Sequence, residues 1–234
     1  KELSPLDLVD ASIQRIETVD AEVNALPIHC FEQARAKAKA IDIKAHADNP
    51  KSLCGLPIAV KDYNDLGGAV TTYGSPIFAD SVAKSSDATV RQLEGNGAIA
   101  VAKSNVPEWA GGHTFNPVNG LTRNPWDMRK SAGGSSGGSA VAVATGMAPL
   151  ATGSDHGGSL RIPACFSGVV GHRATPGTVP HEGRTITQTN YSLQGPIARN
   201  IADAGLLLAT IARRDRNSRR DPMAFPLNVD AFLE

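Results

Sequence analysis

The sequence predicts an α/β fold, and two observations support this prediction. Short apolar runs typical of buried strands alternate along the chain with longer stretches typical of helices. The composition is also aliphatic, with 41% hydrophobic but only 5% aromatic residues, and it includes 23 glycines and 15 prolines. We therefore expect an aliphatic core with tight connections, and 234 residues are enough for one large domain.

Two helices are predicted near the start of the chain. The first spans residues 4–18, where Ser4 is a favourable N-cap, Pro5 takes the first helical position and Asp7 completes a capping box. The second spans residues 29–47, which are rich in alanine and lysine. Its alternating charges indicate a face exposed to solvent rather than a partner site.

A strand–helix–strand unit is predicted next. Residues 56–60 form a short apolar run typical of a buried strand, and residues 98–102 form a second one. The helix between them is expected at residues 88–94, before a stop at Gly-Asn-Gly. Lys61 and Asp62 follow the first strand directly, so an extended backbone should point their side chains to opposite faces.

The second half of the chain is predicted to begin with a long ordered loop at residues 104–134, which contains three prolines and both tryptophans. The elements expected after this loop are a small-residue helix at 139–145, a strand at 148–152, a helix at 162–166, a tight return at 168–171, a strand or turn at 192–196 and an apolar helix at 201–211. Residues 214–234 are expected to form an extended surface or linker segment.

Charge and cysteine content narrow the functional classes. The 23 basic and 23 acidic residues balance, so no electrostatic case exists for nucleic acid or an anionic membrane as a direct partner. Cys30, Cys54 and Cys165 show no metal or disulfide spacing and predict reduced, buried thiols in a cytoplasmic protein. We expect no metal and no cofactor. No apolar run is long enough to span a bilayer. The sequence leaves open whether a leader peptide was removed before Lys1.

Two glycine-serine loops carry the chemistry of the sequence. They are residues 133–139 (GGSSGGS) and 153–159 (GSDHGGS). A phosphate-binding P-loop is disfavoured because Ser139 stands where that motif requires lysine. A nucleophile elbow is disfavoured because the residues before the first loop are polar, whereas the elbow follows a hydrophobic strand.

The pattern around these loops resembles the amidase signature family. The similarity extends along nearly the whole chain, and its motifs are GLPIAVKD at 55–62, TRNPWD at 122–127, the two glycine-serine loops, GVVG at 168–171 and SLQGP at 192–196. The resemblance implies an amidase signature fold, a mixed β-sheet core with helices on both sides. Members of the family are longer, so residues 1–234 would form one domain that comprises the N-terminal and central portion.

The resemblance also implies a serine–serine–lysine triad. By motif position, Ser159 would be the nucleophile, Ser135 the bridging serine with a cis peptide bond, and Lys61 the general base. A serine needs an adjacent base to become nucleophilic, and burial at a strand end would give the lysine a suitable pKa. The other implied residues are the backbone oxyanion donors His156, Gly157, Gly158 and Ser159, and the supporting or substrate-binding residues Ser136, Asp155 and Arg161.

The implied activity is hydrolysis of a carboxamide through an acyl-enzyme. The substrate would be a small-molecule amide, and a homodimer is possible. One alternative is the amidase subunit of a glutamine-dependent tRNA amidotransferase, which would require protein partners. A truncated, non-catalytic binding module is another alternative, although the intact triad argues against it.

Overall fold

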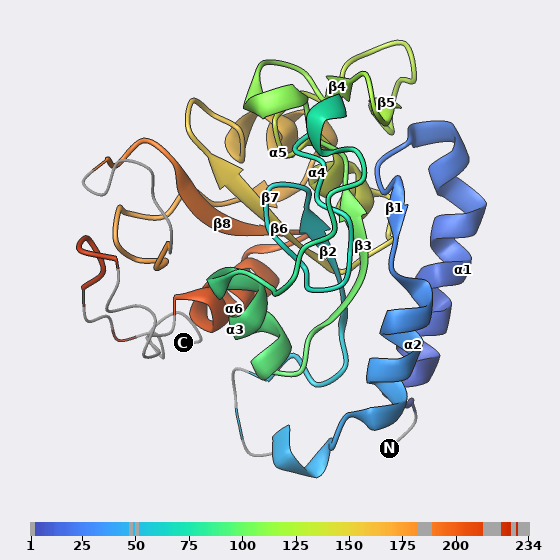
Figure 1. Ribbon diagram of the computed structural model, residues 1–234, viewed down its shortest axis with the longest axis vertical. Helices are drawn as coiled ribbons and strands as arrows, with labels where there is room; N and C mark the ends of the chain where they lie inside the picture. Colours follow the sequence, from blue (N-terminus) through green and yellow to red (C-terminus); the bar gives the residue numbers. More distant parts are fainter. Residues whose placement is uncertain are drawn as a thin grey trace.

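The computed structural model describes residues 3–46, 49, 52–181, 189–212, 221–225 and 228. A six-stranded mixed sheet runs through them in the order β1-β3-β2-β6-β8-β7 (Figure 1). The central strand β2 is parallel to β3 and β6, whereas β1, β8 and β7 each pair antiparallel with a neighbour. The strands are β1 (Ile28–His29), β2 (Pro57–Lys61), β3 (Ile99–Ser104), β6 (Leu150–Asp155), β7 (Val170–Gly171) and β8 (Leu193–Ala198). The predicted α/β fold with a mixed sheet is confirmed.

Helices cover both faces of this sheet, as predicted. Helices α1 and α4 contribute to the core on one face, and α3 and α6 to the core on the other. The helices are α1 (Pro5–Val23), α2 (Phe31–Ala40), α3 (Ala88–Gly95), α4 (Gly137–Ala144), α5 (Arg161–Ser167) and α6 (Ile201–Ile211). Three single 3-10 turns (Lys44–His46, Pro76–Phe78 and Glu108–Ala110) and a hairpin of β4 (Phe115–Asn116) and β5 (Gly120–Leu121) complete the described part.

The alternation of side chains along β2 decides where its last residue points. Ile58 and Val60 belong to the core that contains α3 and α6, whereas Ala59 belongs to the core that contains α1 and α4. Lys61 follows Ala59 at the strand period of two. Its side chain therefore lies on the α4 side, near the residues that begin that helix.

Several boundaries differ from the predicted ones. Helix α1 continues to Val23 and ends at Asn24, which adopts a left-handed conformation with φ 52°. The predicted helix over residues 29–47 is shorter, because residues 28–29 pair with β3 and Ile41 is extended at the end of α2. Strand pairing therefore accounts for the later start of the helix, at Phe31, and the extended backbone of Ile41 for its earlier end.

Two further expectations need correction. Cys30 is buried but Cys165 is exposed, because α5 turns Pro163, Ala164 and Ser167 toward the interior instead. In the segment predicted as surface or linker, most residues lie outside the described ones. Asp221, which is described, departs from the expectation: its side chain is buried and accepts a hydrogen bond from the backbone N–H of His181 at 2.9 Å.

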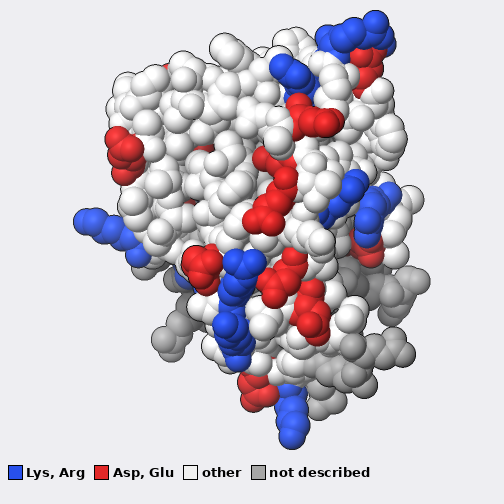
Figure 2. Space-filling view, turned by 90° about the vertical axis from the view of Figure 1, so that its right-hand side faces the viewer, with Lys and Arg blue, Asp and Glu red and all other residues white. Residues whose placement is uncertain are grey.

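The helices can be tested for membrane-spanning length, and the surface for separation of charge. None of the helices in the described ranges is both long and apolar enough to cross a bilayer. Figure 2 shows one face of the molecule, on which basic and acidic side chains are interspersed rather than separated by sign. This interspersion agrees with the balanced net charge of the sequence.

A buried ion pair lies beside the end of β2. Lys103 Nζ on β3 lies 2.9 Å from Asp62 Oδ1, and both side chains are almost fully buried. The Lys103 amine also donates to Thr71 Oγ1 at 2.8 Å, and Asp62 accepts from the backbone and hydroxyl of Thr72. Asp62 thus pairs with a cation of its own, separate from the contacts of Lys61.

Replacing Lys103 with Met is expected to reduce the free energy of unfolding by about 3–5 kcal/mol, because Asp62 would remain as an uncompensated buried charge. Urea unfolding of the wild type, Lys103→Met, Asp62→Asn and the double variant would measure this. We expect the double variant to be more stable than Lys103→Met alone. Additive losses from the two single changes would contradict the pairing.

Candidate active site

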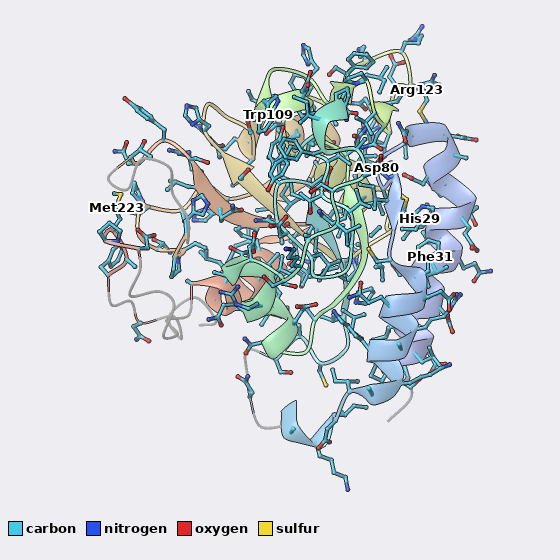
Figure 3. The ribbon with its side chains drawn as sticks, viewed as in Figure 1. His29, Phe31, Asp80, Trp109, Arg123 and Met223 are labelled. Carbon is cyan, nitrogen blue, oxygen red and sulfur yellow. The ribbon has the colours of Figure 1, made fainter. Side chains whose placement is uncertain are left out.

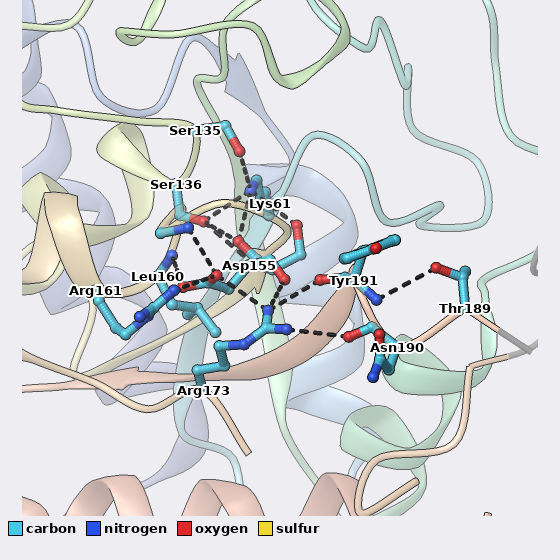
Figure 4. Close-up of polar contacts among 12 residues, drawn as sticks. Lys61, Ser135, Ser136, Asp155, Leu160, Arg161, Arg173, Thr189, Asn190 and Tyr191 are labelled. Atoms are coloured by element: carbon cyan, nitrogen blue, oxygen red, sulfur yellow. Dashed lines mark hydrogen bonds and ion pairs between the residues drawn. The ribbon is translucent and has the colours of Figure 1, made fainter. Parts of the chain in front are cut away.

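The centre of the site is the side chain of Lys61, which is fully buried at the end of β2. Its Nζ lies 2.7 Å from Ser135 Oγ and 2.7 Å from Ser136 Oγ (Figure 4). Ser154 supplies two more oxygens, its Oγ at 2.9 Å and its carbonyl at 3.3 Å. All four oxygens are uncharged, so the amine is hydrogen-bonded but has no carboxylate in direct contact.

This environment favours the neutral amine. Burial of Lys61 holds its pKa well below its ordinary value, because an ammonium ion loses its hydration there. The negative charge of Asp155 acts in the opposite direction and raises the pKa, but it is the weaker of the two effects. A lysine with a lowered pKa is neutral over a wider pH range than an ordinary lysine, and only the neutral amine can accept a proton.

The two serines next to Lys61 differ in their hydrogen bonds. Ser136 Oγ donates to the carbonyl of Ser154 at 3.2 Å and accepts from its N–H at 3.3 Å. The hydrogen of Ser136 is thereby committed, so its hydroxyl can only accept from Lys61. Ser135 Oγ contacts Lys61 alone among the described residues, which leaves its hydrogen free to point at the amine lone pair.

The backbone at Ser135 is tightly enclosed. The Gly134–Ser135 peptide bond is cis, as the family resemblance implied. A Cβ atom on Gly134 would lie 2.2 Å from the carbonyl oxygen of Gly112, so only glycine fits there. Helix α4 begins two residues after Ser135, and the serine pair therefore lies between a crowded loop and a helix start.

The second glycine-serine loop follows β6 and is held by Asp155. The carboxylate of Asp155 is fully buried and accepts from the backbone N–H of Gly158 at 2.8 Å and of Leu160 at 3.1 Å. It also contacts Arg161 at 3.0 Å and Arg173 at 3.1 Å. Burial alone would raise the pKa of Asp155, but the hydrogen bonds from Arg161 and the two amides outweigh it and hold the pKa well below its ordinary value.

Three of the four predicted oxyanion donors are available. In the described part of the chain, the backbone N–H groups of His156, Gly157 and Ser159 donate to no acceptor. Gly158 departs from the prediction, because its N–H already donates to Asp155. Three unpaired N–H groups within four residues form a concentrated set of donors for a developing negative charge.

Ser159 itself is half-buried, and the structure links it to the serine pair through the backbone. Its carbonyl accepts a hydrogen bond from the N–H of Ser136 at 3.1 Å. Its hydroxyl makes no hydrogen bond with any described residue, including Ser135. The structure thus brings Lys61, Ser135 and Ser136 into direct contact, and it links Ser159 to them through its carbonyl rather than through its hydroxyl.

The sequence leaves two roles open for Arg161, recognition of a substrate carboxylate or an internal ion pair. Its side chain is 57% exposed and bidentate to Asp155, at 3.0 and 3.1 Å. The contact observed is therefore the internal ion pair. Its guanidinium and the buried carboxylate hold the start of α5 against the end of β6.

Sequence reasoning missed three residues that contact this site. Thr152 Oγ1 accepts a hydrogen bond from the backbone N–H of Lys61 at 2.8 Å, and Ser154 Oγ contacts the Lys61 amine. Both lie on β6, the parallel neighbour of β2, at the spacing of two that places side chains on one face, and that signal could have found them. Arg173 lies 18 residues from Asp155 in sequence, and no local pattern indicates their contact.

An aromatic stack lies on another side of Lys61. Its Nζ is 5.0 Å from the ring centroid of Tyr63, which stacks with Tyr73 at 6.0 Å. Tyr73 stacks in turn with Trp109 at 5.6 Å, and that indole is 58% exposed (Figure 3). This stack adds apolar surface near the amine and contributes to the low polarity of its surroundings. Within the described ranges, no cluster of His, Cys, Asp and Glu has a metal-binding arrangement.

The Amidase family model matches residues 7–232. The chain belongs to this family. Among Amidase relatives, it is 40% identical over 235 residues to a glutamyl-tRNA(Gln) amidotransferase subunit of Anaeromyxobacter dehalogenans (strain 2CP-C). That match covers 100% of this chain and 47% of the relative.

Solved structures of Amidase proteins share the fold. A bacterial aryl acylamidase of the amidase signature family superposes with a TM-score of 0.87 and 32% identity, over 97% of this chain and 47% of that one. The native peptide amidase of Stenotrophomonas maltophilia gives a TM-score of 0.87 and 31% identity, over 97% and 48%. The chain thus spans about half the length of the relatives it matches, and the predicted amidase signature fold is confirmed.

Proposed function

We propose that the protein hydrolyses carboxamides through an acyl-enzyme, with Ser159 as nucleophile, Ser135 as proton bridge and Lys61 as general base. One observation carries this proposal: a buried lysine with a lowered pKa lies 2.7 Å from a serine hydroxyl that has no other described partner. A neutral amine in that position can take the hydroxyl proton, and the hydroxyl can take a proton from a second serine.

The proposed reaction balances as two acyl transfers. The Ser159 oxygen bonds to the amide carbonyl carbon while its proton passes to Ser135 and the Ser135 proton passes to Lys61. The carbon–nitrogen bond then breaks as Lys61 returns its proton to Ser135 and the Ser135 hydroxyl proton passes to the nitrogen of the leaving amine or ammonia. Water repeats the sequence on the ester, releasing the carboxylic acid and restoring Ser159.

The developing carbonyl oxyanion would be bound by the unpaired N–H groups of His156, Gly157 and Ser159. The loss of one such donor typically costs about 2.7–4 kcal/mol of transition-state stabilisation. No metal or cofactor is needed for this chemistry. Ser136, with its hydrogen committed to Ser154, serves as a support for the amine rather than as a proton carrier.

A second candidate is the amidase subunit of a glutamine-dependent tRNA amidotransferase. The 40% identity to a protein of that name favours it. In that case Lys61 and the serines would hydrolyse glutamine, and the released ammonia would pass to a partner protein. The amide chemistry is the same in both cases, so the two differ in substrate and partners.

The experiment is an amide panel on the full-length gene product, combined with mass spectrometry of the trapped enzyme. The panel contains acetamide, benzamide, an anilide, a peptide amide and glutamine. We expect ammonia or amine release with at least one of them and an acyl adduct on the peptide that contains Ser159. Turnover of glutamine alone, with a copurifying ammonia-accepting protein, would support the amidotransferase candidate. If a folded protein shows no turnover and no adduct, both candidates are refuted.

A further inference from the structure

Arg173 lies two residues after β7 and has only 23% of its side chain exposed. Its Nη1 donates to the carbonyl oxygen of Asp155, to Asp155 Oδ1 at 3.1 Å and to the carbonyl of Tyr191 at 3.0 Å. Its Nη2 donates to the carbonyl of Asn190 at 3.1 Å (Figure 4). One guanidinium therefore joins the end of β6 to residues 190–191.

The segment held by Arg173 lies against the second glycine-serine loop. The rings of Tyr191 and His156 are 5.5 Å apart and inclined at 42°. His156 directly follows Asp155. Arg173 contacts Asp155 and Tyr191 contacts His156, so the two contacts involve neighbouring residues of the loop. Arg173 therefore holds the backbone on both sides of this ring contact, at Asp155 next to His156 and at Tyr191.

The contact to the Asp155 carbonyl has a direct geometric consequence. That carbonyl and the N–H of His156 belong to one planar peptide unit, in which a trans bond points the two groups in opposite directions. A donor that fixes the carbonyl oxygen thereby also fixes the direction of the His156 N–H. This N–H is one of the three that make no hydrogen bond within the described part.

Arg161 does not duplicate these contacts. Among the described residues, the Arg161 side chain makes its hydrogen bonds only with the carboxylate of Asp155, and it is 57% exposed. Arg173 is the more buried of the two and holds backbone carbonyls on two segments as well as the carboxylate. The planar, multi-donor guanidinium suits this task, whereas a lysine amine has a single centre from which to reach the same oxygens.

We propose that Arg173 is a positioning residue that aims the His156 N–H at the reacting carbonyl and ties the second glycine-serine loop to residues 190–191. This inference rests on the proposed function, since it assigns a role to the loop only if Ser159 is acylated. Arg173 itself touches no reacting atom. Its removal should slow the chemical step more than it weakens binding of a reactant.

The test measures the rate of covalent labelling of Ser159 by an alkyl fluorophosphonate, on the full-length gene product. In Arg173→Ala we expect the maximal labelling rate constant to fall about 100-fold, within the range for a lost oxyanion donor, while the half-saturating probe concentration changes less than about threefold. Ethylguanidinium added in solution should restore the rate at least tenfold by filling the vacated space. The maximal labelling rate constant of Arg173→Lys, which keeps the charge, should lie between those of the wild type and Arg173→Ala.

Controls separate the possible failures. Arg129→Met removes an 89% exposed arginine that pairs with Asp127 and should label like the wild type, with or without ethylguanidinium. If the wild type is not labelled at Ser159, the proposed function itself fails. If the wild type is labelled and the folded Arg173 variants label as fast, or ethylguanidinium restores nothing, only the positioning role is overturned. Should Arg173→Ala fail to fold, Arg173→Lys decides by the same comparison.

Discussion

The Ser159→Ala variant is expected to lose amide hydrolysis by roughly 10⁶-fold, the scale on which removal of a triad nucleophile acts. No acyl-enzyme can form without the Ser159 oxygen. The N–H donors and the lysine remain, but they have no covalent intermediate to stabilise or protonate. The fold should be unaffected. The Ser159 hydroxyl makes no hydrogen bond with a described residue, so the free energy of unfolding should change by less than about 0.5 kcal/mol.

Turnover of the best amide in the panel, with fluorophosphonate labelling and urea unfolding, measures this prediction. Ser85→Ala provides the matched control, because Ser85 is an exposed serine away from the two glycine-serine loops. Ser135→Ala should lose less than Ser159→Ala, about 10²–10⁴-fold, since it removes a proton bridge and leaves the nucleophile. Full turnover in a folded Ser159→Ala protein would eliminate the assignment of the nucleophile.

Elements with strong local signals were predicted well. Helix α6 spans the predicted residues 201–211, because it is predominantly apolar and Asn200 caps its start through a hydrogen bond from the N–H of Asp203. Strand β2 lies within one residue of the predicted run. The motif resemblance placed Lys61 and Ser135 in one site, and they are in contact in the structure.

The remainder depends on contacts that have no local pattern. Strand β1 is only two residues long and exists because it pairs with β3, so the predicted helix over residues 29–47 wrongly included His29 at its start. The pairing of Lys103 with Asp62 joins residues 41 positions apart. The contacts of Arg173 likewise depend on the sheet order. Periodicity describes which side of an element is buried, but not which distant partner it meets.

The Lys61→Met variant is expected to lose about 10²–10⁴-fold in turnover and, at the same time, to gain stability at neutral pH. The loss follows from removal of the proposed base. The gain follows from proton linkage. Burial lowers the pKa of Lys61 in the folded protein, whereas in the unfolded chain it titrates near ~10.4. Between these two pKa values the unfolded state binds the extra proton, so the wild type loses stability as the pH falls.

Methionine carries no such proton, so the difference in unfolding free energy between Lys61→Met and the wild type should grow in favour of the variant as the pH falls from about 10. Its slope should approach about 1.4 kcal/mol per pH unit, then level off below the folded pKa of Lys61. Urea unfolding of both proteins between pH 6 and pH 10 measures it, with the 74% exposed Lys130→Met as control.

The pH dependence, rather than the stability at any one pH, is the decisive quantity. Methionine cannot form the hydrogen bonds that the amine makes with Ser135, Ser136 and Ser154, and their absence lowers the stability of the variant by an amount independent of pH. The slope is free of this offset. A difference that stays constant across the range would show that Lys61 is charged in the folded protein, and a charged lysine could not serve as the base.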